Sequence, residues 1–253
     1  MESTKTRILK KLLETDGYLS GQDLCEQLGV SRTAVWKYMK QLKEEGYEIE
    51  AVQNKGYCLK DVPDVLGESE IKSRLHTRWA GQTLYYYDEI DSTNTQIKRL
   101  AEEDAPHGTL AVADYQSKGK GRRGHAWDSP HGSAIYMSIL FRPDIRPDRA
   151  SMLTLVIGLS VAQAIRSNLG VQAQIKWPND IVLNGKKLVG ILTEMSAQMN
   201  YIEYLVTGIG INANLREFPE ELADKATSLQ KEIGHKVNRS ALIAECMKKI
   251  EEN

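Results

Sequence analysis

Apolar residues in the first sixty positions recur at the three- and four-residue spacing of helices. We predict three short helices: one ending at Asp16-Gly17, one between the capping residue Ser20 and Gly29, and one beginning at Ser31. Two short strands are expected to follow within residues 47–59. Two helices around a tight glycine turn, followed by such a wing, are typical of a winged helix-turn-helix that binds DNA.

The outward face of the third predicted helix favours DNA binding. Between Ser31 and Lys43 the chain has four basic residues and no acidic one, and the acids resume at Glu44. The candidate DNA-binding residues are Ser31, Arg32, Thr33, Trp36, Lys37 and Lys40 on the helix and Lys55 at the wing tip. The alternative is a small helical interaction module with solvated lysines, because the first 65 residues hold ten Lys/Arg against eleven Asp/Glu.

The rest of the chain alternates strands with helices. Pro63 lies in a predicted linker, so we place a winged helix-turn-helix domain at 1–62 and a second domain at 63–253. Strands are expected at 84–90, 109–116, 134–141, 174–183, 187–195 and 201–210, and helices around 97–101, at 149–168 and at 238–252. This order predicts an α+β fold with a mixed sheet and its helices on one face.

Composition narrows the class of protein. The chain is 41% hydrophobic and 26% charged, its net charge is −1, and no run approaches the roughly 18 apolar residues of a membrane-spanning helix. The N-terminus has no apolar signal region, and three widely spaced cysteines argue against a disulfide framework, so we expect a cytoplasmic protein without a membrane partner. The five histidines are scattered singly, and no structural metal is expected.

A glycine-rich basic loop at 117–127 is the first candidate for chemistry. Gly119–Gly124 matches GxGxxG, but the loop leads into a strand rather than a helix, which excludes a dinucleotide fingerprint. Gly185-Lys186 lacks the preceding glycine of a Walker A sequence. The loop cations could bind phosphates and a carboxylate through bidentate and backbone contacts. A mobile basic surface loop fits the composition equally well.

Six motifs, in one order, resemble those of biotin protein ligases. They are Asp91-Ser-Thr-Asn94, Gln116 before the basic loop, Trp127 with Ser129-Pro130, Lys176-Trp-Pro-Asn-Asp180, Lys187–Glu194 and Gly208–Asn212. The resemblance spans roughly residues 85–215. The first domain resembles that of the subgroup which also represses the biotin operon.

The resemblance implies that biotin and ATP, with Mg²⁺, are converted to biotinyl-5′-AMP, and that biotin then passes to a lysine of an acceptor domain. The implied biotin-binding residues are Ser92, Thr93, Asn94, Gln116, Gly119, Lys120, Gly121, Arg122, Lys187 and Gly190. The implied ATP and adenylate contacts are Lys118, Arg122, Arg123, Trp127, Lys176, Asn179 and Asn212.

Lys187, Arg122 and Asp180 are the catalytic residues that the resemblance implies. Lys187 would reduce the repulsion between the biotin carboxylate and the α-phosphate. Asp180 would support Mg²⁺ or activate the acceptor lysine. Structural alternatives stay open for some site residues: Lys187 follows an Asn-Gly turn and could be an exposed hairpin lysine, and Trp127 and Trp177 could be core aromatics, which is what we expect for Trp177.

The chain departs from the usual family pattern in three places. Lys120 and His125 stand where the loop usually has arginines, and a lysine cannot make the bidentate fork of an arginine. The chain ends at Asn253, before the small C-terminal β-barrel that the resemblance leads us to expect.

The expected partners are a biotin carboxyl carrier domain, operator DNA and a second copy in a ligand-promoted homodimer. Two other functions compete with this interpretation. One is a regulator that only senses biotin or its adenylate, and the other is a lipoate ligase relative.

Overall fold

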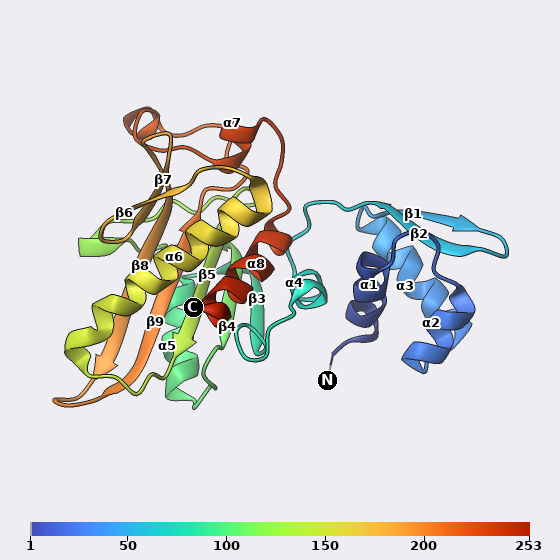
Figure 1. Ribbon diagram of the computed structural model, residues 1–253, viewed down its shortest axis with the longest axis horizontal. Coiled ribbons are helices and arrows are strands. Elements are labelled where there is room, and N and C mark those ends of the chain that lie inside the picture. The colour runs from blue at the N-terminus through green and yellow to red at the C-terminus, as the bar shows by residue number, and fades with distance from the viewer. Residues whose placement is uncertain (1) are drawn as a thin grey trace. The chain divides into compact units, whose positions relative to one another are not determined.

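A break between Arg74 and Leu75 divides residues 2–253, which the computed structural model describes, into two units (Figure 1). The boundary expected from the sequence lies at residue 62, twelve residues earlier. The first unit extends further because the helix α4 (Glu68–Arg74) packs against α1 (Thr4–Glu14).

The first unit is the expected winged helix-turn-helix. Its remaining elements are α2 (Gly21–Leu28), α3 (Arg32–Glu44), β1 (Glu48–Val52) and β2 (Gly56–Asp61), with the two strands antiparallel. A serine precedes each of the first three helices, and its hydroxyl accepts a hydrogen bond from a backbone N–H of the first turn; the three are Ser3, Ser20 and Ser31. Buried apolar residues from all three helices and β1 form one core.

The wing is tied to the helices at its base. The backbone N–H and carbonyl of Leu19, which precedes α2, bond to the carbonyl and N–H of Tyr57 at 2.7 and 2.9 Å. Gly56 has a φ of +108°, and a Cβ there would collide with the Leu19 carbonyl. Only glycine meets both demands, so this residue lets the wing lie against the turn before α2.

The second unit is built on a seven-stranded sheet, which is mixed as the sequence predicted but has one strand more than expected. Its strands are β3 (Leu84–Ile90), β4 (Leu110–Gln116), β5 (Ile135–Phe141), β6 (Gln174–Lys176), β7 (Asp180–Leu183), β8 (Lys186–Ala197) and β9 (Ile202–Ile211). Their spatial order is β3-β4-β5-β9-β8-β7-β6, with β3 and β4 parallel and all other neighbours antiparallel.

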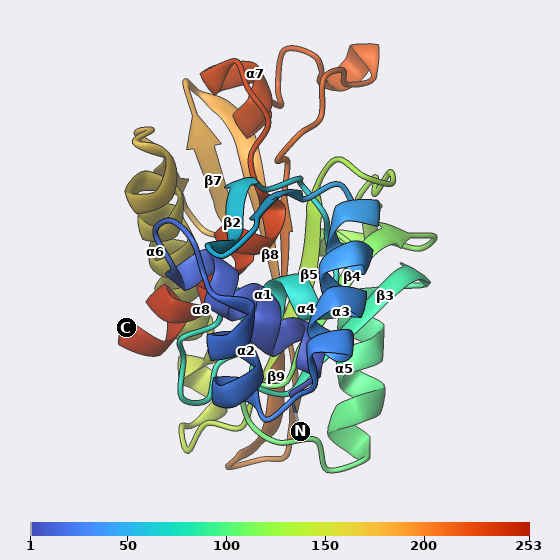
Figure 2. The same ribbon diagram turned by 90° about the vertical axis from the view of Figure 1, so that its right-hand side faces the viewer.

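Helices cover both faces of this sheet, so the expectation of a single covered face was wrong. The helices are α5 (Thr93–Glu102), α6 (Ala150–Leu169), α7 (Leu229–Ile233) and α8 (Arg239–Glu252), with 3-10 turns at Arg122–Gly124, Pro147–Arg149 and Glu220–Leu222. Ile97 of α5 packs with Leu140 and Val206 on one face. Gly158 of α6 faces Ile191 on the other, where α6 also packs against α8 (Figure 2). Periodicity marks a buried helix stripe but does not say which sheet face receives it.

The segment from Pro147 to Leu169 is long and apolar enough, by composition, to cross a membrane. Its helix α6 packs against β8 and α8. This packing is typical of a core helix in a folded domain.

The expected single strand at 174–183 is two strands, β6 and β7, joined by a tight turn at Trp177-Pro178, a cis peptide bond. Proline has no N–H to donate to a strand ladder, and it stands at the turn. The short β7 pairs with β8 only as far as Gly190. Beyond that point, residues 191–197 of β8 pair with β9 on one side, and no strand of residues 2–253 pairs with their other side.

We expect Gly56→Ala to destabilise the winged helix by at least about 2 kcal/mol, because the new methyl group meets both a left-handed backbone and the Leu19 carbonyl. Urea unfolding of the full chain checks this. Gly67→Ala is the matched control, since no heavy atom lies within 4 Å of its added Cβ. Equal stability of the two variants would contradict the proposed role of Gly56.

Candidate functional site

A pocket of about 470 Å³ opens on the α5 face of the sheet. It lies between the start of α5, the basic loop and the glycines of β8 and β9. Residues predicted from the sequence that line it are Ser92, Thr93, Asn94, Gln116, Lys120, Gly121, Arg122, Trp127, Asn179, Lys187 and Gly190. The fold therefore brings together residues from five separate motifs.

Neutral hydrogen-bonding groups form the floor of this pocket. The Gln116 side-chain oxygen accepts from the backbone N–H of Thr93 at 2.8 Å. Ser138 of β5 is fully buried, and its hydroxyl lies 2.7 Å from Thr93 Oγ1 and 2.6 Å from Asn94 Oδ1. The Ser92 N–H donates to Asp91 at 2.7 Å, and an Arg99 hydrogen bond holds the pKa of Asp91 below its usual value. Such a floor suits a neutral polar ligand with both donors and acceptors.

Glu194 of β8 fixes the orientation of Asn94. Asn94 Nδ2 donates to Glu194 Oε2 at 2.8 Å, and Lys98 Nζ donates to Glu194 Oε1 at 2.6 Å. Burial raises the pKa of Glu194, but the hydrogen bonds from Lys98 and Asn94 together outweigh it, and the net pKa is lowered. The amide of Asn94 is therefore held by a charged acceptor.

The basic loop folds back on itself as a small hairpin beside the pocket. The Trp127 N–H bonds to the Gly119 carbonyl at 2.9 Å, and the Gly121 N–H bonds to the His125 carbonyl at 2.7 Å. Two of its cations bond to neutral groups: Lys120 Nζ to Thr95 at 3.0 Å, and Arg122 Nη1 to Asn179 Oδ1 at 2.7 Å. Both hydrogen-bond partners are neutral, while the charge of Lys120 also acts on Asp91 and Glu194 and helps to lower the pKa of each.

Trp127 forms the wall between this pocket and a second one. Its indole lies over two glycines: a methyl group at Gly190 would stand 2.5 Å from Trp127 Cζ3, and one at Gly210 would stand 2.6 Å from Cε2. The second pocket, of about 710 Å³, is lined by Trp127, Lys187, Asn212 and mostly apolar side chains of the segment 215–226, with Asp128 and Glu217 as the acidic residues of its wall. Trp127 Nε1 is buried and has no hydrogen-bond partner among the described residues.

Lys187 lines both pockets. Its Nζ is 2.8 Å from Asp180 Oδ1 and 5.4 Å from the centre of the Trp127 ring. Asp180 Oδ1 makes no hydrogen bond of good geometry, so this contact is a close ion pair. The Lys187 backbone bonds to Lys225 and Thr227. The amine is therefore held at the boundary of the two pockets rather than displayed on an exposed hairpin.

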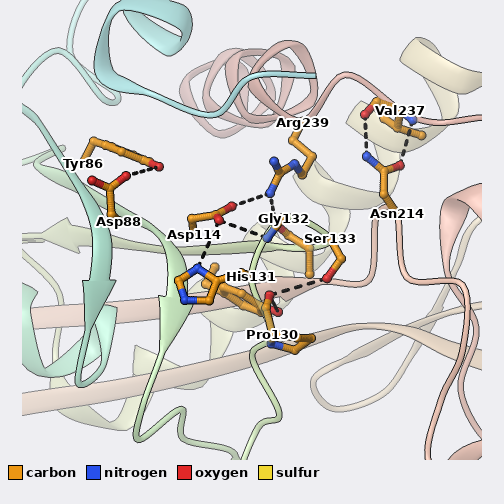
Figure 3. A network of polar contacts seen from close by, with 12 residues as sticks. Tyr86, Asp88, Asp114, Pro130, His131, Gly132, Ser133, Asn214, Val237 and Arg239 are labelled. Atoms are coloured by element: carbon orange, nitrogen blue, oxygen red, sulfur yellow. Dashed lines mark hydrogen bonds and ion pairs between the residues drawn. The ribbon is translucent and has the colours of Figure 1, made fainter. Parts of the chain in front are cut away.

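A polar network backs the segment that follows Trp127 (Figure 3). Asp114 of β4 accepts from Arg239 at 2.7 Å and from the Gly132 N–H at 3.0 Å. The Tyr136 hydroxyl donates to the Pro130 carbonyl at 3.1 Å. Arg239 is 4% exposed, so the 130–133 segment is anchored to the start of α8 by a buried charge.

Several predicted residues lie outside the two pockets. Lys118, Arg123 and Lys176 are exposed and line neither pocket, and Gly119 lies behind the loop against Trp127 and Ser129. Trp177 is 76% exposed, so its expected core position was wrong. The candidate DNA-binding residues are all exposed, on α3, at its N-cap or at the wing tip: Ser31, Arg32, Thr33, Trp36, Lys37, Lys40 and Lys55.

Sequence reasoning missed Ser138, Gly210 and most of the second pocket. Glycines inside strands indicate a close approach of another group, and this signal could have identified Gly210. Nothing in the sequence pairs Ser138 with α5, because that contact depends on strand order. Within residues 2–253, no group of three or more His, Cys, Asp or Glu side chains could hold a metal ion.

Comparisons with known proteins match both units. Residues 86–212 match the model of the biotin/lipoate A/B protein ligase family, and residues 4–58 match an HTH domain. The bifunctional ligase/repressor BirA of Bacillus spizizenii is 47% identical over 96% of this chain and 76% of its own length. The Escherichia coli protein of the same name is 34% identical over 92% of this chain and 71% of its own.

A solved biotin protein ligase from Aquifex aeolicus, in complex with biotin and ATP, is similar in structure. It superposes with a TM-score of 0.58 and 38% identity, covering 68% of this chain and 69% of that one. A ligase from Leishmania major, 22% identical with a TM-score of 0.56, shares the fold.

We expect Glu194→Gln to lower the free energy of unfolding at neutral pH. Because folding lowers the pKa of Glu194, the carboxylate stabilises the fold above the ordinary value of 4.5, and this stabilisation is lost as the pH falls through the lowered pKa. The difference from the wild type should therefore shrink below pH 4.5, which urea unfolding at several pH values measures. Glu102→Gln, at an exposed position on α5, is the control. A pH-independent difference would show that charge is not the cause.

Proposed function

This chain belongs to the biotin/lipoate A/B protein ligase family, and we propose that it joins biotin to an acceptor lysine through biotinyl-5′-AMP and represses transcription through its winged helix. The observation on which the proposal rests is the pair of pockets that meet at Trp127 and Lys187. One has the neutral polar floor that a ureido ring needs, and the other has aromatic and apolar walls suited to an adenine.

In the first step, a carboxylate oxygen of biotin attacks the α-phosphorus of ATP, and the bond to the β-phosphate breaks to release pyrophosphate. Biotin occupies the pocket floored by Thr93, Gln116 and Asn94, with its carboxylate towards Lys187. The two reacting anions repel each other until a fixed cation lies between them. The ammonium of Lys187, held at the pocket boundary by Asp180, supplies that charge. Arg122, docked on Asn179, adds a second cation beside it.

In the second step, the amine of an acceptor lysine attacks the acyl carbon, the bond to AMP breaks, and an amide forms. The attacking amine loses a proton in this step. Asp180 lines neither pocket, but it is ion-paired with Lys187 at their boundary, and we assign it as the carboxylate that accepts this proton once the Lys187 ammonium has turned to the substrate. The acceptor is a biotin carboxyl carrier domain, and relatives named biotin–[acetyl-CoA-carboxylase] ligases support this assignment.

Mg²⁺ enters with ATP. It would be carried by the ATP phosphates and would neutralise part of their charge during the attack on the α-phosphorus. Asp180 is committed to Lys187, so the ion-pair role is better supported for this residue than a metal-binding role. The other nucleotide contacts are Trp127 against the base and Asn212 at the pocket edge.

Biotin, rather than lipoate, is the substrate, because the solved Aquifex aeolicus relative, 38% identical, is a biotin protein ligase in complex with biotin and ATP. Two further relatives, 32% and 35% identical, are named biotin–[acetyl-CoA-carboxylase] ligases. A pure biotin sensor has no need of the second pocket or of a cation at the boundary. ATP, operator DNA and the acceptor occur together in the cytoplasm, where three free cysteines also remain reduced. We place the protein there.

Repression uses a homodimer promoted by biotinyl-AMP. Ile191 of β8 bonds to Asn179, but beyond it the edge at 193–197 pairs with no strand of residues 2–253. This edge is a template for a second strand, and two copies can pair antiparallel through it. Exposed apolar side chains line the groove beside this edge: Leu155, Trp177 and Met195 are 41%, 76% and 52% exposed. Arg122 lines this groove as well as the biotin pocket, so a bound adenylate that contacts Arg122 can change the surface beside the β8 edge. A dimer presents two winged helices to two operator half-sites.

We expect Lys187→Ala to slow biotin-dependent pyrophosphate release by about 10²–10³-fold, as loss of a transition-state charge does, while biotin binding is largely retained. Pyrophosphate release and calorimetric titration with biotin provide the two measurements. The control is Lys186→Ala, because the Lys186 amine bonds to the Ala223 carbonyl and lines neither pocket. Wild-type rates in Lys187→Ala would contradict the catalytic role.

We expect Met195→Asp to prevent dimerisation and to weaken operator binding at least about tenfold, because the two DNA-binding domains lose their mutual tether. Sedimentation with biotinyl-AMP, and gel shifts with DNA selected by the wild-type protein from random sequences, test this. Adenylate synthesis should be unchanged. Met199→Asp, 95% exposed in the turn after β8, is the control. A dimer that forms normally in Met195→Asp places the interface elsewhere.

A further inference from the structure

A chain of hydrogen bonds joins the floor of the biotin pocket to the wall that it shares with the nucleotide pocket. The Thr93 N–H donates to Gln116 Oε1 at 2.8 Å, and Gln116 Nε2 donates to Ser129 Oγ at 3.0 Å. Ser129 Oγ then donates to the Trp127 carbonyl at 3.0 Å. Ser129 lines neither pocket, yet it is the link between them.

The direction of these bonds is set by the ends of the chain. A backbone N–H can only donate, so the oxygen of the Gln116 amide faces Thr93 and its nitrogen faces Ser129. The Ser129 hydroxyl has a single hydrogen. Since it accepts from Gln116, this hydrogen is available for the Trp127 carbonyl. The second hydrogen on Gln116 Nε2 is left for a ligand in the pocket.

Rotation of the Gln116 amide by half a turn would reverse the chain. Its oxygen would then take the Ser129 hydrogen, and the Trp127 carbonyl would lose its donor. At Thr93 the amide nitrogen would face the backbone N–H, and only the Thr93 hydroxyl, which lies 3.1 Å from the present amide oxygen, could accept from it. A ligand carbonyl that accepts from Gln116 Nε2 favours the first arrangement over the second. A bound ligand shifts such an equilibrium by its difference in affinity for the two states.

Close packing makes the Trp127 backbone sensitive to this bond. Ser129 is 3% exposed, and a methyl group on Gly119 would stand 2.7 Å from its Oγ. The Trp127 N–H bonds to the Gly119 carbonyl at 2.9 Å, so the Trp127 residue is held on both sides, by Gly119 and by Ser129. The indole on that backbone forms the wall of the second pocket.

We propose that Ser129 is a positioning residue that couples the two pockets: a ureido group bound at Gln116 fixes the Ser129–Trp127 hydrogen bond and so completes the nucleotide pocket. The proposal rests on the function proposed above. It makes biotin raise the affinity for nucleotide, and the reciprocal effect follows, since binding free energies are linked.

The test is calorimetric titration with ATP whose α- and β-phosphates are joined by a methylene bridge, with and without saturating biotin. In the wild type we expect biotin to raise the affinity for this nucleotide by about 5- to 150-fold, the usual range for linked sites. Ser129→Ala should bring this factor close to one while leaving the affinity without biotin unchanged. The matched control is Ser133→Ala, which removes a hydroxyl from the same segment but not from the chain.

The pattern of affinities separates coupling from a merely structural role. A structural defect in Ser129→Ala would weaken nucleotide binding equally with and without biotin, and this result overturns the proposal. So does an undiminished effect of biotin on nucleotide affinity in Ser129→Ala, or the lack of any such effect in the wild type. Ser129→Thr keeps the hydroxyl and should restore coupling; its loss in a folded threonine variant also overturns it. If the alanine variant does not fold, Ser129→Cys, a weak donor of similar size, should show reduced coupling. A wild type that binds no biotin overturns the proposed function itself.

Discussion

The close packing of the Trp127 indole on Gly190 and Gly210 is the constraint on which the site depends. Two neighbouring strands lack side chains at the same level, and an aromatic ring fills the space they leave. The ring divides one open sheet face into a polar pocket and an apolar one. The Lys187 amine lies 5.4 Å from the centre of this ring, so the position of the ring also places the cation at the boundary between the pockets. The two substrates therefore meet different chemical environments because Gly190 on β8 and Gly210 on β9 have no side chain.

The electrostatics of the site follow from the choice of partners. Lys120 and Arg122 bond to a hydroxyl and an amide, which hold their positions without neutralising their charge. A site that must gather a carboxylate and phosphates benefits from fixed cations that lack acidic partners. Lys187, by contrast, is paired with Asp180. The loop cations attract the carboxylate and the phosphates. Lys187, whose position is fixed by Asp180, can lie between these two anions.

Local signals in the sequence predicted much of the fold and part of the site. Serine caps and helical spacing located α1, α2 and α3, and the Asn184-Gly185 turn located the β7–β8 hairpin. The turn at Trp177-Pro178 divides the strand expected at 174–183, and a proline in a strand indicates an edge or an interruption without saying which. Contacts that depend on strand order, such as Ser138 with α5, have no local signature. Whether Trp177 is buried could not be predicted for a similar reason. A large apolar side chain is expected to pack against other groups, but the sequence does not say whether these belong to its own domain or to another molecule.

The placement of the four tryptophans has a spectroscopic consequence. Trp36 and Trp177 are largely exposed, on α3 and on the β6–β7 turn, and Trp79 packs against His107 and Phe141 away from both pockets. Replacing these three by phenylalanine leaves Trp127, in the wall between the substrates, as the single tryptophan, which can be excited selectively over the eleven tyrosines at long wavelength. The emission of an indole depends on the polarity and hydrogen bonding of its surroundings. The protein thus contains its own optical probe, able to follow the filling of each pocket in real time without an added label.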